Sequence, residues 1–424
     1  MTNYSRQNYF LQIRRLLAMA GLAAMLMPAL AQQQIMKLAS DKKTLPTIGS
    51  AFAPDGSLWL LQQDAQARLT LQVSKDDGNS WQPARVLDTG SDTVKTSGES
   101  PPRLLFGSGG VVIVSYAQPL AKKFTAEIRL LRSTDGGATF AAPVTLHQDR
   151  QVISHSFSNM AFDGKGVLHT VWIDSREKVA TVAAAAAAAS SGKAGNANVA
   201  YRGVSLYRNV SLDGGATFGP DTKLADHSCE CCRLALSATP DGRVAAMWRQ
   251  VLEPNIRDHA FAILPALADF SASATSATPV KPVRASHDNW AIDGCPHHGP
   301  GLTMAAGGGY HAVWFGDRAG VAQVRYGKLD QTGQPVGEVQ PLPDERAEHA
   351  DIMSSGGKLV IVWRSFDGQG MNMKAWVSDD DGRHFRLRQL ARTEGDSDYP
   401  RLLNKNGQIF VIWNTTGKRH VEAF

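Results

Sequence analysis

Four short stretches share one pattern: residues 74–81 read SKDDGNSW, residues 133–140 read STDGGATF, residues 211–218 read SLDGGATF, and residues 378–385 read SDDDGRHF. Each has a serine, an aspartate two positions later, a glycine two positions after that, and an aromatic residue at its end. This order suits a tight turn between two strands, because the serine and aspartate oxygens accept hydrogen bonds from nearby backbone N–H groups and glycine adopts a positive φ without steric cost. Four copies in one chain predict a repeated β-structure.

A second repeat sets the number of structural units. Seven segments combine an apolar strand, a glycine-containing turn and a second apolar strand that carries an aromatic residue. They begin roughly 50 to 70 residues apart, which is the period expected of propeller blades. The segments are residues 50–61, 102–116, 158–172, 234–248, 301–314, 351–363 and 401–413. We therefore predict an all-β, seven-bladed β-propeller with four antiparallel strands per blade, closed by residues 35–40 as the missing strand of the last blade.

The four turn sequences resemble the Asp boxes of the sialidase superfamily (BNR repeats), in particular its Cys/His-containing bacterial exo-α-sialidase-like members. The resemblance spans nearly all of residues 32–424. It implies an Asp-box propeller whose boxes are structural and face away from the active site. Known sialidases of this family have six blades, so a six-bladed ring is the alternative.

The N-terminus has the pattern of a bacterial signal peptide. Basic residues precede an apolar run over residues 16–27, and the small-x-small step Ala29-Leu30-Ala31 follows, so we expect residues 1–31 to be removed. The Arg14-Arg15 pair leaves both Sec and Tat export open. The apolar run is too short for a membrane span. We therefore expect a periplasmic or secreted protein.

The composition is that of an ordinary globular protein, with 43% hydrophobic and 20% charged residues. Removal of residues 1–31 takes away three arginines and no acid, so the formal net charge falls from +5 to +2. This charge gives no reason to expect a nucleic-acid partner. We expect a monomer that binds a small molecule, a glycan or a metal ion on the channel face of the ring.

All four cysteines lie in two strings, HSCECCR (residues 227–233) and DGCPHHGP (residues 293–300). Each string leads into the first strand of a blade, and these two blades are neighbours, so we expect the strings to meet on one face. Three or four thiols with nearby imidazoles suit a soft or borderline ion, here copper or zinc. The predicted ligands are Cys229, Cys231, Cys232, Cys295, His297 and His298.

Further side chains on the same face are predicted to surround this site, as a second shell or an anion-recognising rim. They are Arg233, Arg257, Asp258, His155 and His349. The alternative is structural disulfides, because an even number of cysteines in an oxidising compartment usually pairs. A second bridge would then join cysteines one or two positions apart, which is geometrically strained.

The competing function is glycoside hydrolysis. The resemblance implies that a sialidase of this family uses an arginine clamp for the substrate carboxylate, an aspartate as acid and base, and a tyrosine nucleophile. The candidates on the predicted face are Tyr399, Arg103, Arg249, Arg364, Arg401 and Asp174. The family's Arg-Ile-Pro element is absent, since Arg68 is the only arginine between Gln32 and Val73.

A third possibility is a propeller that binds a glycan or protein without chemistry and is stabilised by disulfides. One segment falls outside the blade pattern: residues 178–200 are rich in alanine and form a low-complexity insertion in a loop of the third blade.

Overall fold

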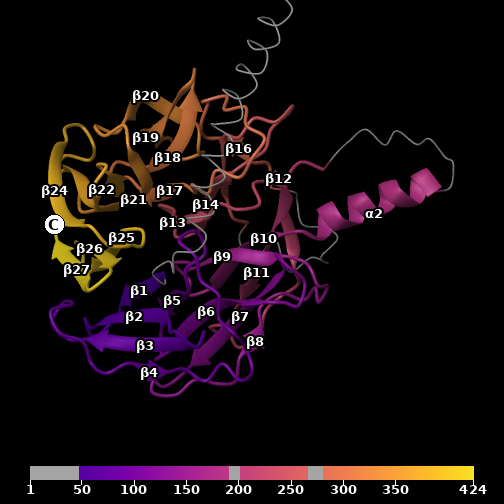
Figure 1. Ribbon diagram of the computed structural model, residues 1–424, viewed down its shortest axis with the longest axis horizontal. Coiled ribbons are helices and arrows are strands. Elements are labelled where there is room, and N and C mark those ends of the chain that lie inside the picture. Colours follow the sequence, from indigo (N-terminus) through magenta and orange to yellow (C-terminus); the bar gives the residue numbers. More distant parts are fainter. Residues whose placement is uncertain (1–46, 191–200, 266–279) are drawn as a thin grey trace, which may run out of the picture. The chain divides into compact units, whose positions relative to one another are not determined.

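Each of the seven repeated segments forms the first two strands of a blade in the computed structural model, which describes residues 47–190, 201–265 and 280–424. The protein is a seven-bladed β-propeller with antiparallel four-stranded blades, as the repeats predict (Figure 1). Only three strands of the last blade fall within the described residues. The predicted closing strand at residues 35–40 and the predicted signal peptide lie outside them, as do residues 191–200 of the insertion.

The strands follow one another regularly along the chain. Blade one contains β1 (Ile48–Phe52), β2 (Leu58–Gln63), β3 (Leu69–Ser74) and β4 (Arg85–Val86); blade two contains β5 (Arg103–Phe106), β6 (Val112–Pro119), β7 (Ala126–Ser133) and β8 (Val144–Thr145). Blade three contains β9 (His155–Phe162), β10 (Leu168–Asp174), β11 (Val204–Ser211) and β12 (Thr222–Ser228); blade four contains β13 (Ala235–Ala238), β14 (Val244–Arg249), β15 (His259–Ile263) and β16 (Val283–Arg284).

The remaining blades repeat the same order. Blade five contains β17 (Gly301–Met304), β18 (Tyr310–Arg318), β19 (Val321–Leu329) and β20 (Pro335–Pro341). Blade six contains β21 (Ala347–Ser355), β22 (Lys358–Phe366), β23 (Met371–Ser378) and β24 (Arg386–Thr393). Blade seven contains β25 (Arg401–Lys405), β26 (Gln408–Thr415) and β27 (Lys418–Ala423).

The first strand of every blade lies at the centre of the ring. β1, β5, β9, β13, β17, β21 and β25 contact one another in turn, and β25 returns to β1. A cavity of about 240 Å³ lies between them and is lined by residues of all seven. Second strands lie deep in the blades, because neighbouring blades cover both of their sides; all residues of β10 and β14, for example, are buried.

Aromatic side chains near the ends of the second strands pack between the blades. Those from the second to the seventh blade are at most 3% exposed. They are Tyr116, Trp172, Trp248, Trp314, Trp363 and Trp413. Their burial identifies them as core residues and excludes a role as a sugar-stacking surface.

The Asp boxes have the predicted turn geometry. In the third box the Ser211 hydroxyl donates to Asp213 Oδ1 (2.7 Å) and accepts from the Gly215 amide (2.7 Å), while Asp213 Oδ1 accepts from the Thr217 amide (2.9 Å). The other three boxes repeat these contacts. All four boxes join the third and fourth strands of their blades, and therefore lie on the face of the ring opposite to the thiols.

The thiol-bearing links and the loops between second and third strands share one face. An isolated bridge joins Ile256, in the loop between β14 and β15, to Ala291, in the link between β16 and β17, and others join such segments to the strand ends beside them, as between Ser228 and Gln250 and between Ser397 and Thr415. This arrangement confirms the predicted topology of the face that carries the ionisable residues.

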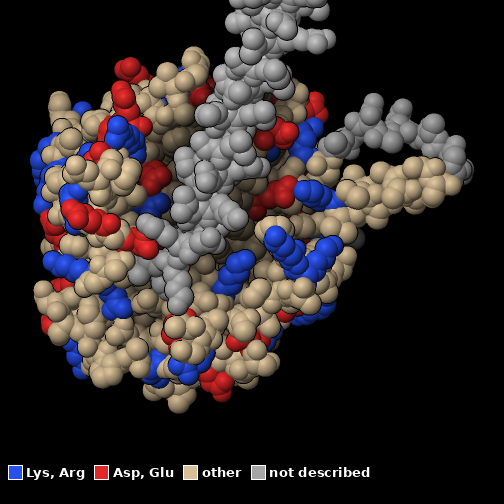
Figure 2. All heavy atoms as spheres, in the orientation of Figure 1, with Lys and Arg blue, Asp and Glu red and all other residues tan. Residues whose placement is uncertain are grey.

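The alanine-rich insertion begins with a helix, α2 (Arg176–Ser190), in the loop between β10 and β11. No residue of α2 is buried. Figure 2 shows charged side chains of both signs near its base and almost none along its length. Among the described residues, no helix is long and apolar enough to cross a membrane.

Candidate functional site

Three thiols converge in the link between β12 and β13. The Cys229 sulfur lies 3.7 Å from that of Cys231 and 3.5 Å from that of Cys232. All three side chains are buried, with exposed fractions of 1%, 6% and 1%, and Phe157 packs against them. None forms a disulfide, which requires a sulfur–sulfur distance of about 2.05 Å. We call Cys229, Cys231 and Cys232 the thiol cluster.

The fourth cysteine lies at the edge of this cluster. Cys295, in the link between β16 and β17, is exposed and unpaired. The pKa of the Cys295 thiol is raised above its usual value, mainly by Cys229, with Cys231 acting in the opposite direction. Among the described cysteines, the set whose sulfurs all lie within 4.8 Å of one another nevertheless contains only the thiol cluster. The two cysteine strings therefore meet on one face, as predicted.

Hydrogen bonds within the cluster favour one thiolate. Contacts from Cys231 and then Cys232 lower the pKa of Cys229 well below its usual range. Contacts from Cys229 and then Cys232 raise the pKa of Cys231. Arg257 Nη1 donates to the Cys229 sulfur at 3.5 Å. A buried guanidinium beside a thiolate stabilises the negative charge. Arg257 thus lies where it was predicted.

Of two further predicted residues, Arg249 contacts the cluster through its backbone, whereas Asp258 pairs with an arginine outside it. The Arg249 carbonyl accepts from the Cys229 amide (2.9 Å), while its guanidinium donates to the carbonyls of His298 (2.8 Å) and Phe315 (2.7 Å). Arg249 is therefore a structural bridge rather than part of a substrate clamp. Asp258, beside Arg257 in the sequence, is buried and pairs with Arg284.

Buried polar atoms without a hydrogen-bond partner gather near the thiol cluster. Within the described residues, Arg257 Nε, Asp258 Oδ1 and His259 Nε2 make no hydrogen bond. Burial lowers the pKa of His259 well below its usual range, so this imidazole is neutral. The sequence prediction missed His259, the first residue of β15, although its place two positions after Arg257 was a usable signal.

The predicted histidine ligands do not join the thiols. His297 is exposed and in the left-handed region (φ 53°). His298 stacks between Phe315 (4.3 Å between ring centroids) and His349 (4.2 Å). Burial, and then repulsion by His349, lower the pKa of His298 to about 2. The ligand atoms of His298, Glu348 and His349 lie within 4.8 Å of one another, in a group separate from the sulfurs.

A second site centres on Tyr399. Its ring stacks on His349 with 3.6 Å between centroids and an interplanar angle of 9°. The Arg364 guanidinium lies over the Tyr399 ring, with its carbon 4.6 Å from the ring centroid. Arg364 also pairs with Glu348 at 2.8 Å. Burial raises the pKa of Tyr399 to about 12, so the phenol keeps its proton at neutral pH.

Glu99 and Arg233 form a buried pair at the centre of the ring. Glu99 accepts from Arg233 Nη1 (3.0 Å), from the Arg233 amide (2.8 Å) and from the Gly299 amide (2.8 Å). Burial opposes ionisation, but Arg233 and His349 outweigh it and hold the pKa of Glu99 below its usual range. Arg233 and His349, predicted to surround the metal site, therefore belong to the Tyr399 site.

Arginines concentrate beside the central cavity. Arg103, Arg233 and Arg401 line it together with Asp351 and Asn159. Burial, and then repulsion by Arg401 and Arg233, lower the pKa of Arg103 to about 9. Arg401 Nε makes no hydrogen bond within the described residues. Arg364 and Arg401 lie over the Tyr399 ring, with their guanidinium carbons 4.6 and 5.7 Å from its centroid. Arg103 lies beside Arg401 in the cavity, and Arg249 does not belong to this group.

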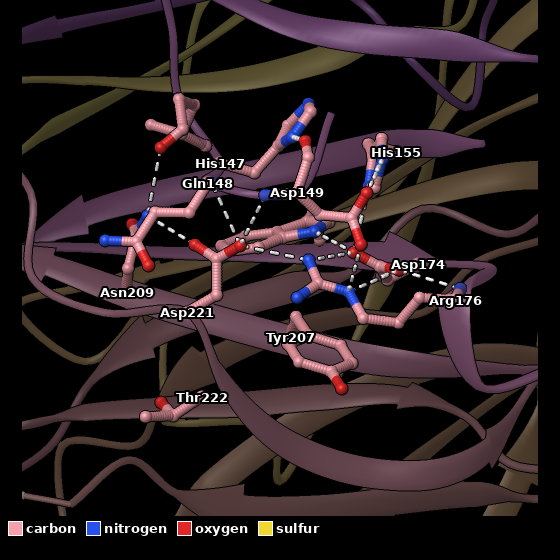
Figure 3. Close-up of polar contacts among 12 residues, drawn as sticks. His147, Gln148, Asp149, His155, Asp174, Arg176, Tyr207, Asn209, Asp221 and Thr222 are labelled. Atoms are coloured by element: carbon pink, nitrogen blue, oxygen red, sulfur yellow. Dashed lines mark hydrogen bonds and ion pairs between the residues drawn. The ribbon is translucent and has the colours of Figure 1, made fainter. Parts of the chain in front are cut away.

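Asp174 lies in a third, separate cluster on blade three (Figure 3). Its side chain is fully buried and accepts from His155 Nδ1 (2.9 Å), Trp172 Nε1 (2.8 Å) and Arg176 Nη2 (2.7 Å). Burial opposes its ionisation, but His155 and Arg176 outweigh burial and hold the pKa of Asp174 below its usual range. Both oxygens of Asp174 thus accept hydrogen bonds from within this cluster.

The same cluster accounts for His155. Its ring stacks on His147 (3.8 Å), and Arg176 also pairs with Asp221 (3.0 Å) and Asp149 (3.7 Å). We call Asp149, Asp174 and Asp221, with Arg176, His147 and His155, the carboxylate cluster. The interactions of His155 are thus with this cluster and not with the thiols. The sequence prediction missed Asp149, Asp221 and His147, which lie on links without a distinctive motif.

No protein-family model matches the chain, and no curated protein matches it. Solved structures share its fold at low identity. An ulvan lyase of polysaccharide lyase family PL25, bound to -[GlcA(1-4)Rha3S]-, superposes with a TM-score of 0.54 at 11% identity, over 88% of this chain and 90% of that one.

Two other matches are more distant. An α-L-arabinanase from Penicillium chrysogenum in complex with arabinobiose gives a TM-score of 0.46 at 15% identity, over 76% of this chain and 88% of that one. The Hadza microbial sialidase Hz136 gives a TM-score of 0.47 at 13% identity, over 87% of this chain and 76% of that one. The fold is therefore one shared with a polysaccharide lyase. The sialidase resemblance itself stays a prediction.

Proposed function

We propose that the protein binds one copper(I) or zinc ion through the thiol cluster. The observation that carries this proposal is the spacing of the sulfurs, 3.5 and 3.7 Å from Cys229 to its two neighbours. Sulfurs about 2.3 Å from a tetrahedral zinc ion lie about 3.8 Å apart, so little rearrangement is needed. The distances are far too long for disulfides.

The surroundings of the thiols support the same proposal. Thiolates are the ligands that copper(I) and zinc prefer, and Arg257 stabilises the charge of the Cys229 thiolate. The burial of all three sulfurs limits oxidation and hydrolysis at the bound ion. When bound, the ion supplies the positive charge that the buried thiolates need. We place the protein in the periplasm or outside the cell, on the basis of its predicted signal peptide.

Metal analysis and thiol counting on anaerobically purified protein test this function. We expect one copper or zinc ion per chain and four thiols after removal of the metal under denaturing conditions. Cys231→Ser should lower the affinity at least about 100-fold, because it removes a direct ligand. Glu230→Gln is the matched control, since Glu230 lies between the cysteines but is half exposed and pairs with Lys178. Protein without metal and without free thiols would contradict the proposal.

A second candidate function is recognition of a carboxylated sugar at the Tyr399 site. Arg364 and Arg401 lie over the Tyr399 ring, and Arg401 also lines the central cavity together with Arg103 and Arg233. Asp351 and Glu99 oppose the charge of Arg103. Arginine binds carboxylates in bidentate fashion. The ulvan lyase of similar fold is bound to a saccharide that contains GlcA, a sugar acid.

Hydrolysis of sialidase type is a more demanding version of this second function. The predicted acid, Asp174, has all its hydrogen-bonding capacity used in the carboxylate cluster. We therefore favour binding over hydrolysis. Release of a fluorescent leaving group from a sialoside distinguishes the two: we expect none from wild type. Cleavage by wild type and not by Tyr399→Phe would instead establish the hydrolase.

A further inference from the structure

The four cysteines differ sharply in their access to solvent. Cys229, Cys231 and Cys232 are buried, whereas Cys295 is exposed. A purely structural metal site is usually closed, with all ligands held alike. One exposed thiol beside three buried ones is instead the arrangement that ligand exchange at the surface requires.

The link that carries Cys295 is fixed on both sides of the thiol cluster. Before Cys295, the Trp290 carbonyl accepts from the Arg257 amide at 2.8 Å. After it, the His298 carbonyl accepts from Arg249 Nη2 at 2.8 Å. Arg257 also contacts the Cys229 sulfur, so the two anchor points flank the cluster. The five residues from Asp293 to His297 contain no regular secondary structure.

The link that carries Cys295 is held beside the cluster. The two residues that anchor this link both contact Cys229: the Arg249 carbonyl accepts from the Cys229 amide, and Arg257 Nη1 donates to the Cys229 sulfur. The Cys295 sulfur lies outside the group of three sulfurs that are all within 4.8 Å of one another. Phe157 packs against the buried thiols. A metal ion that arrives from solvent therefore meets Cys295 before it meets the other three sulfurs.

We propose that Cys295 is the acceptor thiol through which a thiolate-bearing metal donor loads the thiol cluster. This inference rests on the proposed metal-binding function and adds the direction of transfer and the class of partner, a small thiol or protein that carries copper(I) on thiolates. Cys295 loses its proton and bonds to the ion, and a donor sulfur leaves and takes up a proton. Cys229 then replaces the next donor sulfur in the same way. The ion stays copper(I) throughout, so no oxidant or reductant is needed.

Loading kinetics test the inference. The mature protein is mixed anaerobically with copper(I)–glutathione, and thiolate-to-copper absorbance is followed by stopped flow; equilibrium affinity is measured separately by competition with a chromophoric copper(I) chelator. We expect Cys295→Ser to slow loading at least about tenfold, because exchange depends on an accessible thiol. Its equilibrium affinity should stay within about threefold of wild type, because the three buried sulfurs remain.

Two controls separate the outcomes. Cys231→Ser should lower the affinity strongly, and His297→Ala, an exposed change two positions from Cys295, should leave the loading rate unchanged. Unchanged loading by Cys295→Ser would overturn the inference and leave the proposed function intact. So would a loss of affinity in Cys295→Ser equal to that in Cys231→Ser, since Cys295 would then be an ordinary resident ligand. Wild-type protein that takes up no copper(I) would overturn the proposed function itself.

Discussion

The thiol cluster and the carboxylate cluster are both largely buried, yet the bonding of their polar atoms differs. In the carboxylate cluster, Asp174 accepts hydrogen bonds from several donors, and Arg176 reaches three carboxylates. Around the thiols, Arg257, Asp258 and His259 each keep a buried polar atom without a hydrogen-bond partner within the described residues. In the carboxylate cluster His155 Nε2 is the one such atom, and it lies 3.6 Å from Asp149 Oδ1.

This difference separates structure from function. A saturated buried network stabilises the fold, and removal of one member leaves charged partners uncompensated. Buried polar atoms that lie close together but lack hydrogen-bond partners favour the binding of an added ligand. A buried aspartate at a strand end and a cysteine string look equally promising in the sequence; their bonding assigns them opposite roles.

The largest expected effect is on metal affinity. Cys229→Ser removes the sulfur closest to both others, so we expect copper(I) affinity to fall about 1,000-fold, or about 4 kcal/mol. The free energy of unfolding of the metal-free protein should change far less. Competition with a chromophoric chelator, alongside urea unfolding of the metal-free form, measures both. Equal affinity in wild type and variant would remove the distinction between the two clusters.

The reverse pattern is expected for the carboxylate cluster. Asp174→Asn leaves Arg176 and His155 without their charged partner, so the free energy of unfolding should fall by about 3 kcal/mol. Copper(I) affinity should stay within about threefold of wild type. The control is Asp226→Asn, because Asp226 is 43% exposed and pairs with Lys223, and such pairs contribute less than about 1 kcal/mol. A strong loss of metal affinity in Asp174→Asn would contradict this prediction, because it would show that the carboxylate cluster contributes to metal binding.

Acid should weaken the carboxylate cluster through His147. The Ile128 amide donates to His147 Nε2 (3.3 Å), which requires a neutral ring, and burial lowers the pKa of His147 to about 3. The unfolded chain therefore binds a proton that the folded chain does not, and stability is lost as pH falls from about 6.5 toward 3. The slope for one histidine is at most about 1.4 kcal/mol per pH unit.

Urea unfolding between pH 7 and pH 4.5 checks this dependence. His147→Gln keeps a donor and an acceptor but does not titrate, so its stability should fall less steeply with acid than that of wild type. Asp174 contributes in the same direction below about pH 4, because its folded pKa is lowered as well. Identical slopes in wild type and His147→Gln would show that this ring does not titrate with unfolding.

The smallest expected effect lies on the opposite face. Ser211→Ala removes two hydrogen bonds of one Asp box and should cost about 1 to 2 kcal/mol of unfolding free energy. Neither metal affinity nor loading rate should change, because the box lies away from both clusters. Thermal unfolding measures the change in stability, and the chelator and loading assays measure metal affinity and loading rate. Altered loading in Ser211→Ala would contradict this prediction, because it would show that the Asp box affects the thiol cluster.

The fold could be predicted from the sequence because its determinants are local. Each Asp box contains its own hydrogen-bond donors and acceptors, as Ser211, Asp213 and Gly215 show, and each blade repeats one apolar pattern. The meeting of the two cysteine strings followed from the same topology. What remained hidden was the radial position of each residue on the shared face.

That radial position decides the site. His298 is three residues from Cys295 but stacks on His349, toward Tyr399 rather than the sulfurs. Asp174 fits the pattern of a catalytic acid in the sequence, but in the structure it pairs with Arg176, which also contacts Asp149 and Asp221. These contacts join segments that are separated along the chain, and no sequence motif predicts them.

X-ray absorption at the copper or zinc edge of the metal-loaded protein tests the central claim most directly. We predict a first shell of at least three sulfur atoms at about 2.3 Å, lost in Cys229→Ser. A shell made only of nitrogen and oxygen atoms would contradict the account, because it would place the ion with the histidines and carboxylates instead of the thiol cluster.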